Sequence, residues 1–171
     1  MNKVSIQYFN TPVGEMILGS YEDKLCMADW RYRKTRESVD RRVQKGLNAT
    51  FVENESSVLT LAKEELEAYF LGLRKTFDIP LLLVGTDFQK SVWQGLTQIP
   101  YGTTISYGEL AQSIEHNKAV RAVASAVGAN AISIFIPCHR IIGADGSLTG
   151  YAGGLDVKRE LLEIENNLFT I

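Results

Sequence analysis

The sequence predicts an α/β protein of two domains, in which a small domain of strands and helix is followed by a domain of short helices. Residues 4–30 form three short runs of alternating apolar and polar residues, as expected for antiparallel strands. From residue 88 onward, apolar residues instead recur at helical spacing between polar turns. The character of the sequence changes between residues 80 and 87, and we place the domains at residues 1–83 and 84–171.

The first domain begins with a predicted meander. Its strands are "VSIQYFN", "EMILGSY" and "LCMADW", separated by the turns "TPVG" and "EDK". Residues 31–46 are charged and show no apolar stripe, which is typical of a solvated loop or surface helix and indicates no function. Residues 56–73 predict an amphipathic helix with a serine cap and a glycine near its end. Its expected buried face consists of Leu59, Ala62, Leu66, Tyr69, Phe70 and Leu73.

The second domain contains a predicted helix-turn-helix. A helix within residues 86–99 comes first, and its expected apolar face consists of Phe88, Val92, Trp93, Leu96 and Ile99. Ser106 followed three residues later by Glu109 is a capping-box pattern that starts the next helix. The polar turn "EHN" ends that helix, and another helix follows over 118–128. The run "ISIFI" then predicts a buried strand that ends at Pro137.

The helix at 118–128 has an unusual composition. Apart from Lys118 and Arg121 it contains only alanine, valine, serine and glycine, so it is slim. Close packing against another helix is the commoner reason for such a composition. The alternative is a helix that enters a nucleic-acid groove, where Arg121 contacts a phosphate or inserts into the base stack.

Length, charge and cysteine content restrict the function. A chain of 171 residues with 45% hydrophobic residues can bury a core. A net charge of −2 argues against binding nucleic acid through bulk charge, so such binding would depend on a local surface. The sequence shows no signal peptide and no membrane span, which predicts a cytoplasmic protein without a membrane partner. In the cytoplasm the two cysteines, Cys26 and Cys138, stay reduced, and no disulfide is expected.

Cys138 and His139 lie side by side in the most apolar stretch of the chain. A lone cysteine in such a stretch is most often a small core residue. Beside a base, it can instead act as a nucleophile: His139 would take the thiol proton, directly or through one water, and Glu165 would orient the imidazole. Each residue alone has a structural explanation, and only the combination favours catalysis.

Two other chemistries fit the pattern less well. Two cysteines and two histidines are scattered without the paired spacing of metal ligands, so no metal is expected. A cysteine hydrolase is the enzymatic competitor. Adjacent residues on a strand point to opposite faces, however, and the sequence indicates no oxyanion site.

The segments "IPCHRIIGADGSLTGYAGG", "RAVASAVGAN" and "LLEIE" resemble the O6-alkylguanine-DNA alkyltransferases, closely over residues 87–166. The resemblance implies an RNase H-like first domain and a winged-helix, helix-turn-helix second domain. It also implies direct-reversal DNA repair without a cofactor. The protein would bind double-stranded DNA as a monomer and flip the damaged nucleotide through the minor groove. It would then transfer the alkyl group from O6-alkylguanine to its own cysteine in a single turnover, and the sequence leaves open whether O4-alkylthymine is a second substrate. The alternative is a winged-helix regulator or an alkyl-lesion sensor with an inert buried cysteine.

The resemblance also implies roles for individual residues. Cys138 becomes the alkyl acceptor, His139 the base and Glu165 the residue that holds the base. Asn130 braces the site against the recognition helix. Tyr107 helps to rotate the nucleotide and donates a hydrogen bond to the purine.

The same resemblance implies contacts to DNA and to the substrate. Arg121 fills the gap left in the base stack, and small residues of the slim helix allow close approach to the backbone. The implied DNA-contacting residues are Arg121, Tyr107, Ala122, Ala126 and Gly128. Pocket contacts come from main-chain groups of Cys138, Ile141 and the residue after Tyr151. That residue is Ala152, where some members carry serine, so the sequence leaves the substrate range open.

Overall fold

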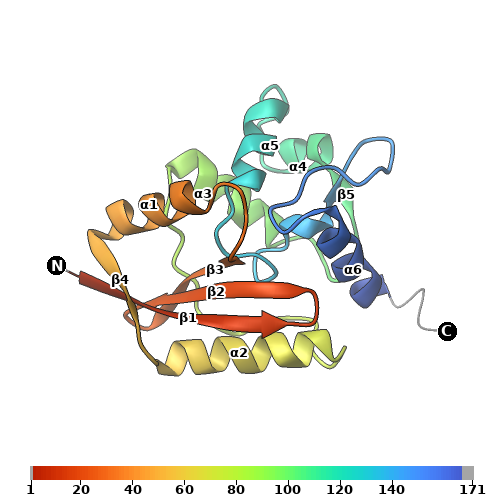
Figure 1. Cartoon of the computed structure of the whole chain (residues 1–171). Coiled ribbons are helices and arrows are strands. Elements are labelled where there is room, and N and C mark those ends of the chain that lie inside the picture. Colours follow the sequence, from red (N-terminus) through yellow and green to blue (C-terminus); the bar gives the residue numbers. More distant parts are fainter. Residues whose placement is uncertain (1, 167–171) are drawn as a thin grey trace. The chain divides into compact units, whose positions relative to one another are not determined.

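The fold is described for residues 2–166 in a computed structural model (Figure 1). Contacts within the chain divide it into two compact units, Met1–Gly85 and Thr86–Ile171. The domain boundary that the sequence predicts, between residues 83 and 84, stays a prediction.

The first unit is built on a four-stranded sheet with the strand order β3-β2-β1-β4 (Figure 1). β1 (Asn2–Thr11), β2 (Gly14–Tyr21) and β3 (Lys24–Trp30) form the antiparallel meander that the alternation predicted. β4 (Ala49–Glu53) pairs with β1 in parallel and was not predicted. The three strands of the meander contribute most of the buried apolar residues of the sheet, among them Val4, Met16, Leu18, Leu25 and Met27.

Helix α2 (Ser57–Phe70) covers one face of the sheet and contacts β1, β2 and β3 (Figure 1). The expected serine cap is present, since the Ser56 hydroxyl accepts a hydrogen bond from the backbone N–H of Leu59 at 3.1 Å. The helix ends earlier than predicted because the chain turns at Gly72, whose φ is 74°. Leu73 is therefore 78% exposed rather than buried.

The charged segment 31–46 forms a surface helix, α1 (Arg36–Leu47), in accord with one of its two interpretations. The expectation that it lacks an apolar side is wrong, because Val39 and Val43 are buried. Two valines one turn apart are enough to anchor a helix that is otherwise charged.

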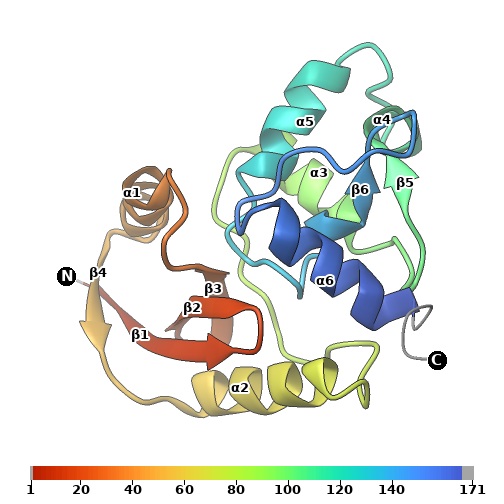
Figure 2. The same cartoon turned by 45° about the vertical axis from the view of Figure 1, so that its right-hand side comes forward.

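Three helices form the core of the second unit (Figure 2). α3 (Asp87–Leu96) packs against α4 (Tyr107–Ser113) and α5 (Val120–Gly128), and the latter two form the predicted helix-turn-helix. The predicted capping box between Ser106 and Glu109 starts α4. The expected face of α3 is buried at Val92, Trp93, Leu96 and Ile99, whereas Phe88 is half-buried.

The segment after α5 is not the predicted strand. Residues 132–136 form a compact turn in which Ser133 bridges Ile136, and Ile134 has a φ of 74°. Pro137 therefore interrupts no ladder. Residues 131–141 are all buried, so the apolar run reflects burial of an irregular segment, which periodicity cannot distinguish from a buried strand.

The chain then continues through a 3₁₀ turn, η1 (Cys138–Arg140), to two short elements. β6 (Ile141–Ile142) pairs in parallel with β5 (Ile105–Ser106) (Figure 2). Helix α6 (Leu155–Asn166) contacts η1. Within residues 2–166, no helix combines the length and the apolar character needed to cross a membrane.

Candidate functional site

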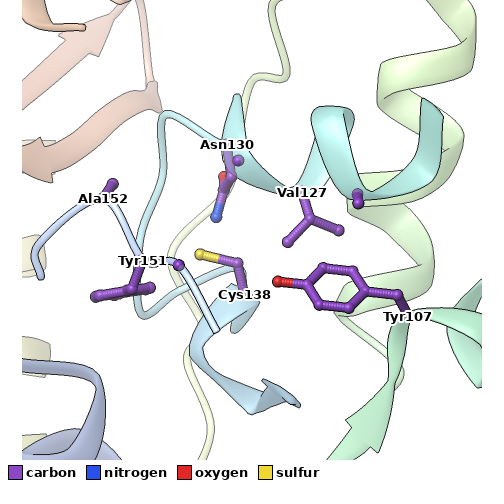
Figure 3. A pocket seen from close by; sticks show the side chains of 9 residues that line it. Tyr107, Val127, Asn130, Cys138, Tyr151 and Ala152 are labelled. Carbon is purple, nitrogen blue, oxygen red and sulfur yellow. The ribbon is translucent and has the colours of Figure 1, made fainter. Parts of the chain in front are cut away.

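A pocket of about 200 Å³ in the second unit contains Cys138 (Figure 3). Cys138 is 7% exposed, and its neighbours in the wall come from α4, from the end of α5 and from the loop before α6. The lining residues are Tyr107, Ala124, Val127, Gly128, Asn130, Cys138, Gly150, Tyr151 and Ala152. Ile141, which was expected at the pocket, is fully buried in β6 and does not belong to this lining.

The structure thus gathers residues that were singled out from distant parts of the sequence. Tyr107, Asn130 and Cys138 share the pocket. Three small residues of the pocket lining were not predicted from the sequence: Ala124, Val127 and Gly150. A small side chain without a functional group gives no sign in the sequence that it lines a pocket.

Asn130 holds the turn that leads to Cys138. Its Nδ2 donates to the carbonyl of Ile136 at 2.9 Å, and its Oδ1 accepts from the N–H of Ile132 at 3.0 Å. One buried side chain therefore fixes both ends of the turn around Ile134. A β-branched residue at positive φ is strained, so these two hydrogen bonds offset a conformational cost next to the thiol.

His139, the residue after Cys138, forms a buried pair with Glu165, and neither of the two lines the pocket. Nε2 of His139 lies 2.5 Å from Oε2 of Glu165, and both side chains are fully buried. A carboxylate in this position accepts the Nε2–H bond and leaves Nδ1 with a lone pair. Nδ1 is buried and, among residues 2–166, has no hydrogen-bond partner. Burial lowers the pKa of His139 despite the opposing effect of Glu165, so the imidazole is neutral at neutral pH and can accept a proton.

Arg140, to which the sequence analysis assigned no role, completes this cluster. Its Nε and Nη2 lie 2.8 and 3.1 Å from the two carboxylate oxygens of Glu165, and its Nη1 donates to the carbonyl of Ile99 at 2.6 Å. Burial alone would raise the pKa of Glu165, but the hydrogen bond with His139 and the hydrogen bonds and positive charge of Arg140 lower it to about 2. An arginine inside an apolar run was the available signal, because a buried guanidinium requires an anionic partner.

Lys158 is a second buried cation that the sequence analysis did not identify. It is fully buried, and its Nζ donates to the carbonyl of Thr149 at 2.9 Å. Burial lowers the pKa of Lys158, whereas the negative charge of an ionised Cys138 raises it. The electrostatic coupling between these two groups means that Lys158 favours the thiolate.

The Glu165 cluster should make the protein sensitive to acid. The pKa of Glu165 falls from 4.5 to about 2 in the folded protein, and the pKa of His139 is also lowered. The folded state therefore binds fewer protons at both groups, so their stabilising effect is complete above the unfolded pKa values and is lost as the pH falls. For Glu165, we expect a loss on the order of 3 kcal/mol between about pH 5 and pH 2. Denaturant unfolding at pH 7 and pH 3 should show a larger loss for the wild type than for Glu165→Gln. Equal losses would contradict this account.

The exposed face of α5 is narrow. Arg121 and Ala122 are exposed near its start, and Ser125 and Gly128 continue the same face at helical spacing. A Cβ atom added to Gly128 would meet no atom within 4 Å, so packing inside the protein does not require glycine there. Ala126, expected among the DNA contacts, is instead buried, and its carbonyl accepts a hydrogen bond from the Trp93 indole at 2.8 Å. Its side chain does not belong to the exposed face.

The two cysteines have different environments. Cys26 is buried in β3, where burial raises its pKa to about 12, so this thiol is not ionised at neutral pH. Of the two, only Cys138 lies in the pocket, and the residue after it is a histidine. Across residues 2–166, no cluster of three or more histidine, cysteine or acidic side chains could hold a metal ion.

The fold and the pocket define a class of two-unit protein in which the unit with the helix-turn-helix also holds a buried cysteine followed directly by a buried histidine. Two family models match the chain. The 6-O-methylguanine DNA methyltransferase ribonuclease-like domain matches residues 4–83, and the DNA binding domain of the same family matches residues 87–167. The chain therefore belongs to the 6-O-methylguanine DNA methyltransferase family, and the predicted family and fold class are confirmed.

Individual relatives align along most of the chain. The methylated-DNA--protein-cysteine methyltransferase of Methanosarcina acetivorans is 45% identical over 159 residues, which cover 93% of this chain and 96% of the relative. The crystal structure of the Mycobacterium tuberculosis O6-methylguanine methyltransferase is 40% identical, with a TM-score of 0.81 and coverage of 96% and 93% of the two chains. A structure of Mycobacterium tuberculosis OGT in complex with DNA is 39% identical, with a TM-score of 0.80 and coverage of 95% and 93%.

Proposed function

We propose that this protein repairs DNA by transferring the alkyl group of O6-alkylguanine to the sulfur of Cys138. The observation that carries the proposal is the surroundings of this thiol. Cys138 lines a pocket, and the adjacent His139 is neutral and held by the carboxylate of Glu165. Membership of the family and the names of the relatives support the same reaction, that of a methylated-DNA--protein-cysteine methyltransferase.

Transfer would begin when the thiol proton of Cys138 moves to Nδ1 of His139, directly or through one water. The resulting thiolate attacks the alkyl carbon, so that the S–C bond forms while the C–O6 bond breaks. The electron pair of the broken bond passes to the guanine, which takes up one proton from Tyr107 or solvent. Glu165 stabilises the imidazolium that forms, and the positive charge of Lys158 stabilises the thiolate before attack.

The reaction should occur once per protein. The product is a thioether, which thiol–disulfide exchange cannot cleave because it contains no S–S bond. Cys26 cannot act as a second acceptor at neutral pH because its pKa is about 12. Each protein molecule would therefore be consumed by one repaired base.

Access to the alkyl carbon requires the nucleotide to leave the base stack. We propose that the exposed face of α5 lies in the minor groove of double-stranded DNA and that Arg121 fills the gap in the stack. Ala122 and Gly128 on this face allow close approach to the backbone, and Tyr107 helps to rotate the nucleotide into the pocket. The protein would act as a monomer in the cytoplasm, where its thiols stay reduced, and O4-alkylthymine would be a second substrate.

The experiment that tests this function is incubation with a duplex containing one O6-methylguanine, followed by measurement of the intact mass. We expect a gain of one methyl group per protein, even with a large excess of DNA, and no gain with an unmodified duplex. Repair of several bases per protein would contradict the proposal. Binding without methyl transfer would favour the alternative of a regulator or lesion sensor.

Arg121→Ala should separate flipping from chemistry. Without the side chain that fills the stack, the transfer rate on duplex DNA should fall by about 10-fold or more, as expected when unstacking by a few kcal/mol is no longer compensated. The reaction with free O6-benzylguanine requires no flipping and should keep its wild-type rate. The measurement is a single-turnover rate with each substrate.

Lys118→Ala is the matched control for Arg121→Ala, because it removes an exposed cation just before α5. It should weaken DNA binding by charge alone and leave the saturated transfer rate unchanged. An equal loss on both substrates for Arg121→Ala would show that Arg121 supports the fold instead.

A further inference from the structure

We infer that Thr149 is a positioning residue for Tyr107, whose phenolic oxygen accepts a hydrogen bond from the Thr149 hydroxyl. The phenolic proton of Tyr107 is then free to point into the pocket and to be donated to the departing purine. This inference rests on the proposed function, since it assigns Tyr107 a task in alkyl transfer.

The contact itself joins the pocket to the loop beside it. The Tyr107 hydroxyl lies 3.0 Å from the Thr149 hydroxyl, and within residues 2–166 it has no other hydrogen-bond partner. Figure 3 shows the Tyr107 hydroxyl directed toward Cys138. Thr149 does not line the pocket but lies directly before Gly150, Tyr151 and Ala152, which do. It can therefore act on the reaction only through its neighbours.

Thr149 is well suited to hold another residue because its own backbone is fixed. Its carbonyl accepts a hydrogen bond from the fully buried Nζ of Lys158 at 2.9 Å. Lys158 belongs to α6, and Tyr107 is the first residue of α4. The two polar groups of Thr149 thus connect two helices on either side of the loop, so that the position of Tyr107 is set by a group that is itself immobilised.

The direction of the hydrogen bond decides whether Thr149 assists or competes. If Tyr107 were the donor, the phenolic proton would have to leave Thr149 before it could reach the purine. If Thr149 is the donor, the phenolic proton stays available, and the bond to the phenolic oxygen makes that proton a better donor. The hydroxyl of Thr149 can rotate, and its backbone is held in place, so the second arrangement needs no rearrangement when the substrate arrives.

The test compares single-turnover transfer rates on saturating O6-methylguanine duplex. Thr149→Val removes the hydroxyl at nearly constant volume and should slow transfer about 3- to 10-fold, the range expected for one neutral hydrogen bond. DNA affinity should be unchanged, and Thr149→Ser should recover most of the rate. Thr149→Ala offers a second variant without the hydroxyl if Thr149→Val does not fold. The matched control is Thr97→Val, the same change at an exposed threonine whose hydroxyl bonds to the carbonyl of Gln94.

A double-mutant cycle with Tyr107→Phe distinguishes positioning from a general structural effect. Thr149→Val should cause no further loss in the Tyr107→Phe background, because the partner hydroxyl is already absent. The inference is overturned by a faster Thr149→Val protein, by a wild-type rate, or by an equal loss in both backgrounds. Failure of the wild type to gain a methyl group would remove the proposed function itself, whereas methyl gain with no effect of Thr149→Val would remove only the role of Thr149.

Discussion

Cys138→Ser should gain no methyl group from O6-methylguanine DNA while binding the same duplex with unchanged affinity. A serine hydroxyl occupies nearly the same volume, but it does not ionise at neutral pH and is a weak nucleophile without strong activation. The contact between His139 and Glu165 is retained, and Cys138 is the one residue of the pocket lining that the substitution changes. The face proposed to lie in the minor groove is on α5 and does not include Cys138. The transfer rate should therefore fall below detection while binding persists.

Intact mass and peptide mapping measure the transfer, and fluorescence anisotropy with the same duplex measures the binding. In the wild type, the methyl group should be found on the peptide that contains Cys138. Cys26→Ser is the matched control, because it changes the other buried thiol, in β3, and should gain one methyl group like the wild type. Methylation of Cys138→Ser, or of Cys26 in the wild type, would show that Cys138 is not the acceptor.

The elements that the sequence predicted well are those with strong local signals. The capping box between Ser106 and Glu109 and the apolar face of α3 both depend on residues within a few positions of each other. Their helices therefore follow from neighbouring residues alone. The strand β4 gave no such signal, since its pairing partner β1 lies more than 40 residues away in the sequence. The turn at 132–136 was missed because burial by the rest of the unit, rather than strand pairing, keeps its residues apolar.

In the candidate site, too, what neighbouring residues determine could be predicted, and what the fold determines could not. The adjacency of Cys138 and His139 is visible in the sequence, but its geometry depends on a 3₁₀ turn that begins just after the end of the predicted strand. Alternation between strand faces is therefore no obstacle to a thiol–imidazole pair here.

The two buried charged residues of α6, Lys158 and Glu165, could have been suspected from helix periodicity. Lys158, Leu161 and Glu165 are spaced by three and four residues and form the buried face of α6. Two charged residues on one buried face indicate a polar cluster, since each must find a partner. What the sequence could not supply is the partner itself: the carboxylate of Glu165 binds both His139 and Arg140, which lie 26 and 25 residues away.

Glu165→Gln should slow alkyl transfer about 10- to 1,000-fold at neutral pH, as loss of support for a positioned acid–base group typically does. A neutral amide stabilises the imidazolium of His139 less than a carboxylate does, so less thiolate forms. Raising the pH should recover part of the loss, because the thiol then ionises without help from the imidazole. The wild-type rate should stay level near neutral pH and decline only in acid, where His139 with its lowered pKa finally becomes protonated. Single-turnover rates against pH for the wild type, His139→Ala and Glu165→Gln measure these effects.

Glu165→Gln removes two contacts at once, the ion pair with Arg140 and the hydrogen bond with His139, and their effects must be distinguished. Glu165→Gln leaves the buried guanidinium without its anion, which should reduce the free energy of unfolding by about 3–5 kcal/mol. Arg140→Gln breaks the same ion pair from the other side but retains the carboxylate at 2.5 Å from the imidazole. It should therefore destabilise the protein, as measured by denaturant unfolding, without producing a rate loss that alkaline pH restores. A folded Glu165→Gln protein with the wild-type pH profile would remove Glu165 from the mechanism, and Lys158 and the apolar pocket would then be the source of thiol reactivity.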